Sequence, residues 1–259
     1  MSNILLIDGD IVIYQQACVN EQIIDWGDGE EATFLTPEIA QANIDDIIAS
    51  WTEKFEAKYV YVCLGSSKNF RKKLQPEYKH FRKKTKKPKL RFDLVQYVSM
   101  NYNVISWDTL EADDVMGIMS TGPLPKKLGT PVIISIDKDM KQIPGYLFNP
   151  NKDTKIKEVT NEEADYFFYL QILMGDPADG YKGIPGVGSK KGEAILENAG
   201  GMGTENGVLW GAVLDAYLEK GMTEEDALLN ARMARILRWE DYDYDRKEIR
   251  LWSPHSATT

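Results

Sequence analysis

Cysteine and histidine are scarce in this sequence. Its 259 residues contain two of each, Cys18 with Cys63 and His80 with His255, and the cysteines do not have the spacing of metal ligands. Any metal site is therefore expected to use oxygen ligands. The two isolated thiols predict reduced cysteines, buried or half-buried, in a reducing cytosol.

Long apolar runs are also lacking. The longest, such as Ile4–Ile7, are far too short to span a bilayer, and Met1–Asp10 lacks a signal-peptide pattern, so we expect no membrane partner. The apolar content of 43% and the charged content of 27% are typical of a soluble globular protein. The length suits one large domain or two small ones, and no internal repeats occur.

Positive charge is sparse in most of the chain and concentrated in one stretch. The net charge is −9, but residues 68–91 carry twelve Lys and Arg with one acidic residue, so this stretch is +11 and the remainder is −20. A solvated helix face is the simple interpretation. Tyr78 and Arg82, however, are spaced to share a helix face, which suits base stacking together with phosphate contact. A local basic field can bind nucleic acid on an otherwise acidic protein.

Strands and helices alternate in the first 160 residues. Short β-branched or aromatic runs predict buried strands at Ile4–Ile7, Tyr59–Leu64 and Val132–Ile136. Thr36 and Pro37 predict a helix start, and the helix would present one apolar face of Ile44, Ile47, Ile48, Trp51 and Phe55. A second helix should run from near Glu111 to about Thr121. This order predicts an α/β fold with a mostly parallel sheet.

The remainder is expected to be mostly helical, with glycine-rich turns. We divide the chain into an α/β catalytic core, residues 1–160, and a helical region with a C-terminal extension, residues 161–259. One late strand is expected at Glu248–Trp252, followed by a frayed tail at Ser253–Thr259.

Acidic residues cluster where a parallel sheet collects functional groups, beyond the carboxyl ends of its strands. They occur after two strands, at one helix start and in the segment MGDPADG: Asp8 and Asp10, Asp137 and Asp139, Glu111, Asp113 and Asp114, and Asp176 and Asp179. Each group alone is explained by a turn or a helix cap. Four groups together would repel one another unless cations lie between them. The pattern predicts a pair of Mg²⁺ or Mn²⁺ ions that support phosphodiester hydrolysis.

A glycine-rich hairpin precedes the predicted helical run Glu193–Asn198. Gly186 and Gly188 permit tight turns, and the helix that follows presents free N–H groups to an anion. An ordinary turn between helices is the simple alternative. The order GIPGVG-Ser189-Lys190-Lys191 favours a helix-hairpin-helix element that grips duplex phosphates.

Taken together, five segments in this order resemble the flap-endonuclease/5′-exonuclease family: IDGD, FRKKLQPEYKHFRKK, LEADDVMG, IDKDMKQIP and GDPADGYKGIPGVG. The C-terminal MTEEDALLNARMARILRWEDYDYDRKEIRLW further resembles the short 5′-exonucleases of lytic podoviruses. The resemblance covers nearly the whole chain. It implies a PIN-like nuclease core with a helix–three-turn–helix DNA clamp. It also implies Mg²⁺-dependent 5′→3′ cleavage of duplex DNA, flaps or RNA·DNA hybrids, in the cytoplasm of a bacterial host if the protein is phage-encoded.

The resemblance also implies roles for individual residues. The first metal site would use Asp8, Glu111 and Asp113 with Asp114 close by, and the second would use Asp137, Asp139, Asp176 and Asp179. Within a basic helical gateway at about residues 68–91, Lys79 and Arg82 would stabilise charge on the scissile phosphate. Further DNA contacts would come from two groups: Arg71, Lys72 and Tyr78, which stacks on a base, and the hairpin with Gly183, Gly186, Gly188, Ser189, Lys190 and Lys191, where a K⁺ ion would bind backbone carbonyls.

One position departs from the family pattern. Such proteins carry an Asp just after the second strand, where this chain has Ser66, and no acidic residue occurs between Glu56 and Glu77. The first metal site would then work with one carboxylate fewer. The loss favours an alternative, a structure-specific DNA-binding protein with weakened or lost turnover. A PIN-type ribonuclease is a further alternative, although such domains usually lack a duplex-gripping hairpin.

Overall fold

The first strand is apolar on both faces, and this pattern sets the layers of the fold. In β1 (Asn3–Asp8), Ile4 and Leu6 pack into one buried cluster, whereas Leu5 and Ile7 pack into another. Successive side chains of a strand point to opposite faces, so a strand that is buried on both sides needs cover on both.

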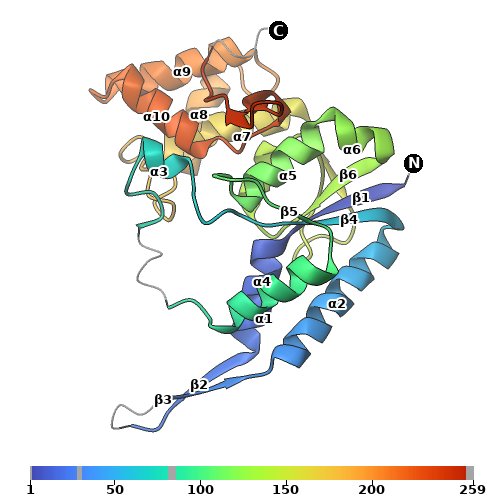
Figure 1. Cartoon of the computed structure of the whole chain (residues 1–259). Helices are drawn as coiled ribbons and strands as arrows, with labels where there is room; N and C mark the ends of the chain where they lie inside the picture. The colour runs from blue at the N-terminus through green and yellow to red at the C-terminus, as the bar shows by residue number, and fades with distance from the viewer. Residues whose placement is uncertain (1, 28–30, 81–85, 255–259) are drawn as a thin grey trace.

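The computed structural model describes residues 2–27, 31–80 and 86–254. In that part of the chain β1 lies inside a six-stranded sheet of order β5-β4-β1-β6-β7-β8 (Figure 1), parallel throughout except for β8. The other strands of this sheet are β4 (Ala57–Cys63), β5 (Val104–Ile105), β6 (Thr130–Ile134), β7 (Gly145–Phe148) and β8 (Lys157–Val159), of which β4 and β6 pair with β1. The predicted mostly parallel α/β fold is confirmed, and β6 begins and ends two residues before its prediction.

Helices cover both faces of the sheet. Helices α1 (Gly9–Val19), α2 (Pro37–Lys54) and α4 (Leu90–Asn101) share the cluster of Leu5 and Ile7, while α5 (Ala112–Thr121) packs with Ile4 and Leu6. The short helices α3 (Arg71–Leu74) and α6 (Pro123–Leu128) complete this part. Helix α2 starts at Pro37 as predicted, but the Thr36 hydroxyl donates to Asn20 instead of capping the helix.

Sequence patterns missed α1 and the hairpin that follows it. Ile11, Val12 and Ile13 continue the β-branched character of β1, and their helical state is imposed by packing against the sheet. Strands β2 (Glu21–Asp25) and β3 (Glu31–Leu35) form a two-stranded ribbon that projects from the body (Figure 1). Cys63 is buried as predicted, whereas Cys18 is exposed. None of the described helices is long and apolar enough to cross a membrane.

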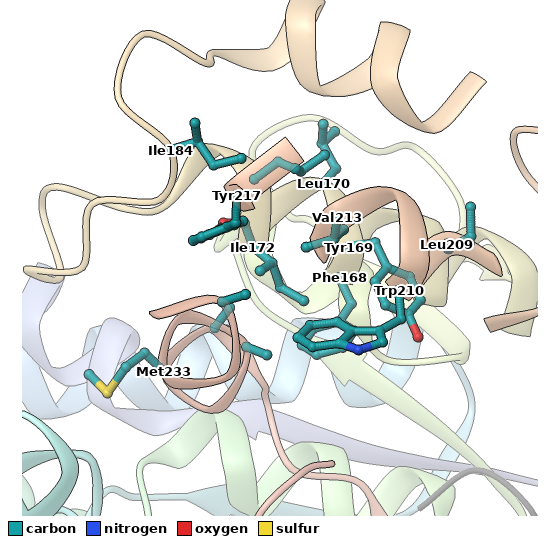
Figure 2. Close-up of a cluster of buried hydrophobic side chains, with 14 of the residues drawn as sticks. Phe168, Tyr169, Leu170, Ile172, Ile184, Leu209, Trp210, Val213, Tyr217 and Met233 are labelled. Atoms are coloured by element: carbon teal, nitrogen blue, oxygen red, sulfur yellow. The ribbon is translucent and has the colours of Figure 1, made fainter. Parts of the chain in front are cut away.

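The described part of the second half is built mainly from helices that pack around an aromatic core. Figure 2 shows side chains of α7 (Asn161–Met174) and α9 (Asn206–Glu219) meeting in this core, with Met233 of α10 (Glu224–Ala234) beside them. Helix α8 (Ser189–Asn198) begins at Ser189, four residues before the predicted Glu193. The predicted late strand shrinks to β10 (Glu248–Ile249), which pairs with β9 (Tyr242–Asp243). Residues 255–259 of the predicted tail lie outside the described part.

The segment after α10 returns to the sheet. Ile236, Leu237 and Tyr242 pack in the same cluster as Ile4 and Leu6. The predicted boundary at residue 160 falls between β8 and α7. The segment after α10, although it follows this boundary in sequence, packs against the sheet of the first region. The two regions therefore share one buried core.

A buried ion pair fixes this return. The Arg71 guanidinium, 3% exposed, donates to both carboxylate oxygens of Asp114 at 2.7 and 2.8 Å and to the carbonyls of Met233 and Arg235. The Asp114 carboxylate also accepts from the backbone N–H of Leu237 at 3.1 Å. Five contacts around one charge pair thus join α3, α5 and the segment after α10.

Replacing Arg71→Met should lower the free energy of unfolding by about 3–5 kcal/mol, because Asp114 would remain as an uncompensated buried charge. The control Lys72→Met removes a neighbouring charge that is exposed and should change stability by less than about 0.5 kcal/mol. Urea unfolding of both variants measures the difference. A loss below about 1 kcal/mol for Arg71→Met would show that the pair does not hold the two regions together.

Candidate active site

Asp8 ends β1 at the edge of the sheet where the predicted carboxylates should meet. Its side chain is 2% exposed, caps α1 by accepting from the Ile11 N–H at 3.1 Å, and accepts from the Ser135 hydroxyl at 2.8 Å. Ser135 directly follows β6, the neighbouring parallel strand. The ends of two adjacent strands therefore hold one carboxylate in place.

Glu111 stands at the start of α5 and is surrounded by donors. Its oxygens accept from the Lys79 ammonium at 2.5 Å, the Tyr78 hydroxyl at 2.7 Å and the Arg71 guanidinium at 3.2 Å. Burial alone would raise its pKa, but the charges of Arg71 and Lys79 lower the pKa of Glu111 to about 2. Asp114 closes the capping box with Glu111 from inside.

Asp137 and Asp139 follow β6 on a tight turn. Asp137 accepts from the Asp139 N–H at 2.8 Å and caps the short 3₁₀ helix Lys138–Gln142. The Gln171 amide of α7 donates to Asp139 at 2.6 Å. The Gln171 side chain thus provides one contact between the helical region and the sheet edge.

Asp176 and Asp179 lie on the turn that follows α7. The Asp176 carboxylate accepts from the backbone N–H of Ala178, and the Lys79 ammonium lies 3.4 Å from Asp179. Lys79 has a positive φ of 55°, and its own N–H donates to the Asp179 carbonyl at 2.9 Å. The backbone conformation of Lys79 is therefore tied to this turn.

These side chains line one cavity of about 160 Å³. The carboxylates on its wall are Asp8, Asp10, Glu111, Asp113, Asp137, Asp139 and Asp179, with Lys79, Tyr78 and Arg71 also present. Asp176 lies beside it, because the Lys138 ammonium is 3.9 Å from both Asp139 and Asp176.

Burial and mutual repulsion work against charge in this cavity. Burial, with the charges of Asp10 and Asp137, raises the pKa of Asp8 to about 7, and burial with the charge of Asp137 raises that of Asp139 to about 6. The pKa of Asp113 is raised well above its usual value by burial and by Asp8. A bound cation would offset this repulsion.

The donor set suits a hard cation such as Mg²⁺ or Mn²⁺, because carboxylate oxygen is the ligand such ions prefer. Within the described residues, no three or more acidic, His or Cys side chains are arranged to hold a metal ion directly. Protein donors occupy several of the oxygens, among them Lys79, Ser135 and Gln171. The carboxylate oxygens of the cavity fit such an ion chemically. In this structure the hydrogen bonds from protein donors hold these carboxylates in position.

Four predicted roles need correction or fall outside the described residues. Asp114 is fully buried and pairs with Arg71, so it is a structural anchor and not a ligand facing the cavity. Arg71 is buried by the same pair and cannot contact DNA directly. Tyr78 is 3% exposed and its hydroxyl binds Glu111, which leaves no open face for a base. Arg82 lies outside the described residues, whereas Lys72 is exposed on α3.

The glycine hairpin connects the turn after α7 to α8. Gly183 has a φ of 59°, and a side chain there would collide with the backbone of Gly175. Gly186, with a φ of 77°, faces open space. Lys190 is exposed, Ser189 donates to Glu193, and the Lys191 ammonium donates to the Gly186 carbonyl at 3.0 Å. The start of α8 is thus an exposed basic surface.

Ser135 and Gln171 were not predicted from the sequence, and Asp10 was predicted only as part of the acidic cluster, without a place in either metal site. Asp10 was visible in IDGD, and its place on the cavity wall follows from the first turn of α1, which was not predicted. Ser135 lies in the predicted strand run, where a serine gives no signal of its own. Gln171 lies in helix α7, and its sequence context gives no sign that its side chain contacts the site.

A mostly parallel sheet with an acidic cavity at its carboxyl edge is the arrangement of a PIN-like α/β fold. Residues 3–164 match the family model described as "5'-3' exonuclease, N-terminal resolvase-like domain", and the chain belongs to this family.

Curated relatives and solved structures agree with this family. The exodeoxyribonuclease of Enterobacteria phage T3 and the exonuclease of Escherichia phage T7 are each 32% identical; the matches cover 98% and 97% of this chain and 93% of each relative. The flap endonuclease of bacteriophage T5, solved as a complex with DNA and metal ions, has a TM-score of 0.66 at 17% identity, covering 90% of this chain and 88% of that one.

Stability in the absence of divalent ions should fall as pH rises from 5 to 7. In this window the folded protein keeps protons on Asp8 and Asp139, with pKa values of about 7 and about 6, that the unfolded chain has released at the ordinary value of 3.8. Millimolar Mg²⁺ should then raise the unfolding temperature by several degrees at pH 7.5 and by much less at pH 5. Thermal unfolding with Mg²⁺ or with EDTA tests this, and an equal effect at both pH values would contradict it.

Proposed function

We propose that the protein is a 5′→3′ exonuclease and flap endonuclease that hydrolyses phosphodiester bonds at the 5′ ends of duplex DNA, flaps or RNA·DNA hybrids with two Mg²⁺ or Mn²⁺ ions. One observation carries the proposal: seven carboxylates and Lys79 line a single cavity at the carboxyl edge of the sheet. We place the activity in phage DNA replication, primer removal or genome degradation, in the cytoplasm of the bacterial host.

Two groups of carboxylates would hold the ions. Asp8, Glu111 and Asp113 would serve the first, and Asp137, Asp139, Asp176 and Asp179 the second. Two ions in such a site activate the attacking water and stabilise the leaving oxygen. Ser135 keeps Asp8 oriented, and Arg71 with Tyr78 keeps Glu111 oriented.

Lys79 supplies the positive charge that the protein itself contributes to the reaction. Burial disfavours the charged ammonium, but the charges of Glu111 and Asp179 raise the pKa of Lys79, so it stays protonated. In the cavity it would contact the scissile phosphate and stabilise the charge that develops there. Binding of substrate would then compete with Glu111 for the same ammonium.

The duplex would be held by the hairpin and the start of α8. Lys190 is exposed, and the first N–H groups of α8 have no side-chain cap. Such a surface suits phosphate contact without sequence readout. A K⁺ ion on the hairpin carbonyls remains part of the proposal, although the Lys191 ammonium already occupies the Gly186 carbonyl. Exposed lysines of the basic segment, such as Lys72, add attraction for DNA.

The second candidate is a structure-specific DNA-binding protein without full turnover. The observation that favours it is Ser66, whose hydroxyl accepts from the Lys68 N–H and lies 3.4 Å from Asp108, outside the cavity wall. A nuclease assay on 5′-labelled duplex, flap, RNA·DNA hybrid and RNA substrates separates the candidates. We expect 5′ products from DNA with Mg²⁺ or Mn²⁺ and none with EDTA. Binding without cleavage would favour the second candidate, and cleavage of RNA alone would favour a ribonuclease.

Lys79→Ala should lower the single-turnover rate by at least about a hundredfold with little loss of affinity, because its contact strengthens as charge develops in the transition state. Affinity is measured in Ca²⁺ and the rate in Mg²⁺. If the variant binds weakly and cuts at the normal rate when saturated, Lys79 acts only in binding.

Replacing Lys190→Ala together with Lys191→Ala should have the opposite effect. Affinity should fall and its salt dependence should flatten by about one to two units of slope, while bound substrate is cut at a near-normal rate. The control removes two exposed lysines of α6, Lys126→Ala with Lys127→Ala, and should leave affinity unchanged, because helix α6 lies away from helix α8 in Figure 1. Equal losses in both double variants would mean that only net charge matters.

A further inference from the structure

The loop that carries Ser66 brings no carboxylate to the cavity. The Ser66 N–H donates to the Leu110 carbonyl, and its hydroxyl faces Lys68 and Asp108 at the surface. Asp108 is itself exposed and pairs with Lys68. The side chain at position 66, where the family pattern has an acidic residue, is therefore not part of the cavity wall.

Asp10 lies on the cavity wall at this same loop. It belongs to the first turn of α1, two residues after Asp8, and one of its oxygens (Oδ2) accepts from the Gly65 N–H at 2.9 Å. Gly65 immediately precedes Ser66. The carboxylate of α1 therefore reaches the strand end that lacks a carboxylate of its own.

Gly65 is pressed between Asp10 and the start of α5. A methyl group on Gly65 would lie 2.8 Å from Asp10 Oδ2 and 3.3 Å from the Ala112 nitrogen. Ala112 lies between Glu111 and Asp113, the two carboxylates that open α5. A side chain at position 65 would crowd the Asp10 carboxylate, so glycine at this position lets Asp10 lie close to the start of α5.

The second oxygen of Asp10 (Oδ1) is held by a cation that is partly exposed. The Arg91 guanidinium of α4 donates to it at 3.2 Å, and both side chains are about one-third exposed, at 34% and 35%. An ion pair at such exposure is weak and exchangeable. Arg91 can leave this oxygen without uncovering a buried charge.

We propose that Asp10 supplies the carboxylate that the first metal site lacks at position 66. The inference rests on the proposed function, since it names a ligand of that same site. With Asp10 included, the first ion would have as many carboxylates as in the family pattern, one of them from the helix that follows β1. Asp10 is then a metal ligand, and Arg91 is the counter-charge that holds it when no ion is bound.

The test measures binding of Mn²⁺ alone by calorimetry, without DNA. Asp10→Asn keeps an oxygen that accepts from the Gly65 N–H but removes the charge, and it should weaken the tighter Mn²⁺ site by at least about tenfold. The unfolding temperature in EDTA should stay near that of the unchanged protein. Asp108→Asn, a carboxylate at the same loop but outside the cavity, should bind Mn²⁺ normally. Adding Ser66→Asp to Asp10→Asn should recover most of the lost affinity.

A second pair of variants covers the possibility that Asp10→Asn fails to fold. Arg91→Gln should tighten Mn²⁺ binding because it frees Asp10, whereas Lys89→Gln, which removes an equal charge two residues away, should not. Mn²⁺ affinity unchanged in both Asp10→Asn and Arg91→Gln would overturn the inference while leaving the nuclease intact. An unchanged protein that binds no Mn²⁺ and cuts no DNA would instead overturn the proposed function, and the inference with it.

Discussion

Repulsion among buried carboxylates is the constraint on which the rest of this structure depends. Asp8, Asp113 and Asp139 have raised pKa values because burial and neighbouring acids oppose their ionisation. The chain meets this cost with donors taken from distant parts of the sequence: Ser135 at the end of β6, Gln171 of α7 and Lys79 of the basic segment. Each donor holds an oxygen in the cavity, and none neutralises the whole cluster. In the proposed function the remaining negative charge would attract a divalent cation, and the repulsion that destabilises the folded chain would then favour metal binding.

Arg71 connects this electrostatic problem to the architecture. Its guanidinium contacts Glu111 on the cavity wall, Asp114 beneath it, and the carbonyls of Met233 and Arg235. The position of Glu111 therefore depends on the segment after α10, although more than 120 residues separate them. A buried charge pair of this kind contributes little net stability against an apolar replacement, but its geometry admits few alternatives. We infer that its value lies in fixing where the helical region docks, which in turn places Asp176, Asp179 and Gln171 at the sheet edge.

Those parts of the site that depend on strand ends could be predicted from the sequence, and those that depend on long-range packing could not. Asp8 and Asp137 follow apolar strand runs, and the ends of parallel strands gather at one edge whatever the rest of the chain does. The roles of Arg71 and Tyr78 were predicted wrongly because a run of basic and aromatic residues looks the same whether it is solvated or buried. Arg71 is buried against Asp114 and Tyr78 against Glu111, which lie 43 and 33 residues away in the sequence, respectively. Helix α1 was not predicted because β-branched residues in its first turn are also typical of a strand. The position of Asp10 on the cavity wall could therefore not be predicted either.

The layers of this fold persist in a distant relative whose side chains are mostly different. A structure that is 17% identical still superposes with a TM-score of 0.66, so few individual side chains are needed to keep the layers and the sheet edge. A metal ion responds to the number, charge and direction of oxygens around it, not to the loop that supplies them. At this edge the carboxyl ends of β1 and β4 are adjacent, since Asp8 pairs with Cys63 in register. The proposed role of Asp10 depends on this adjacency, because a carboxylate in the first turn after β1, two residues from Asp8, lies at the strand end where β4 is followed by Ser66.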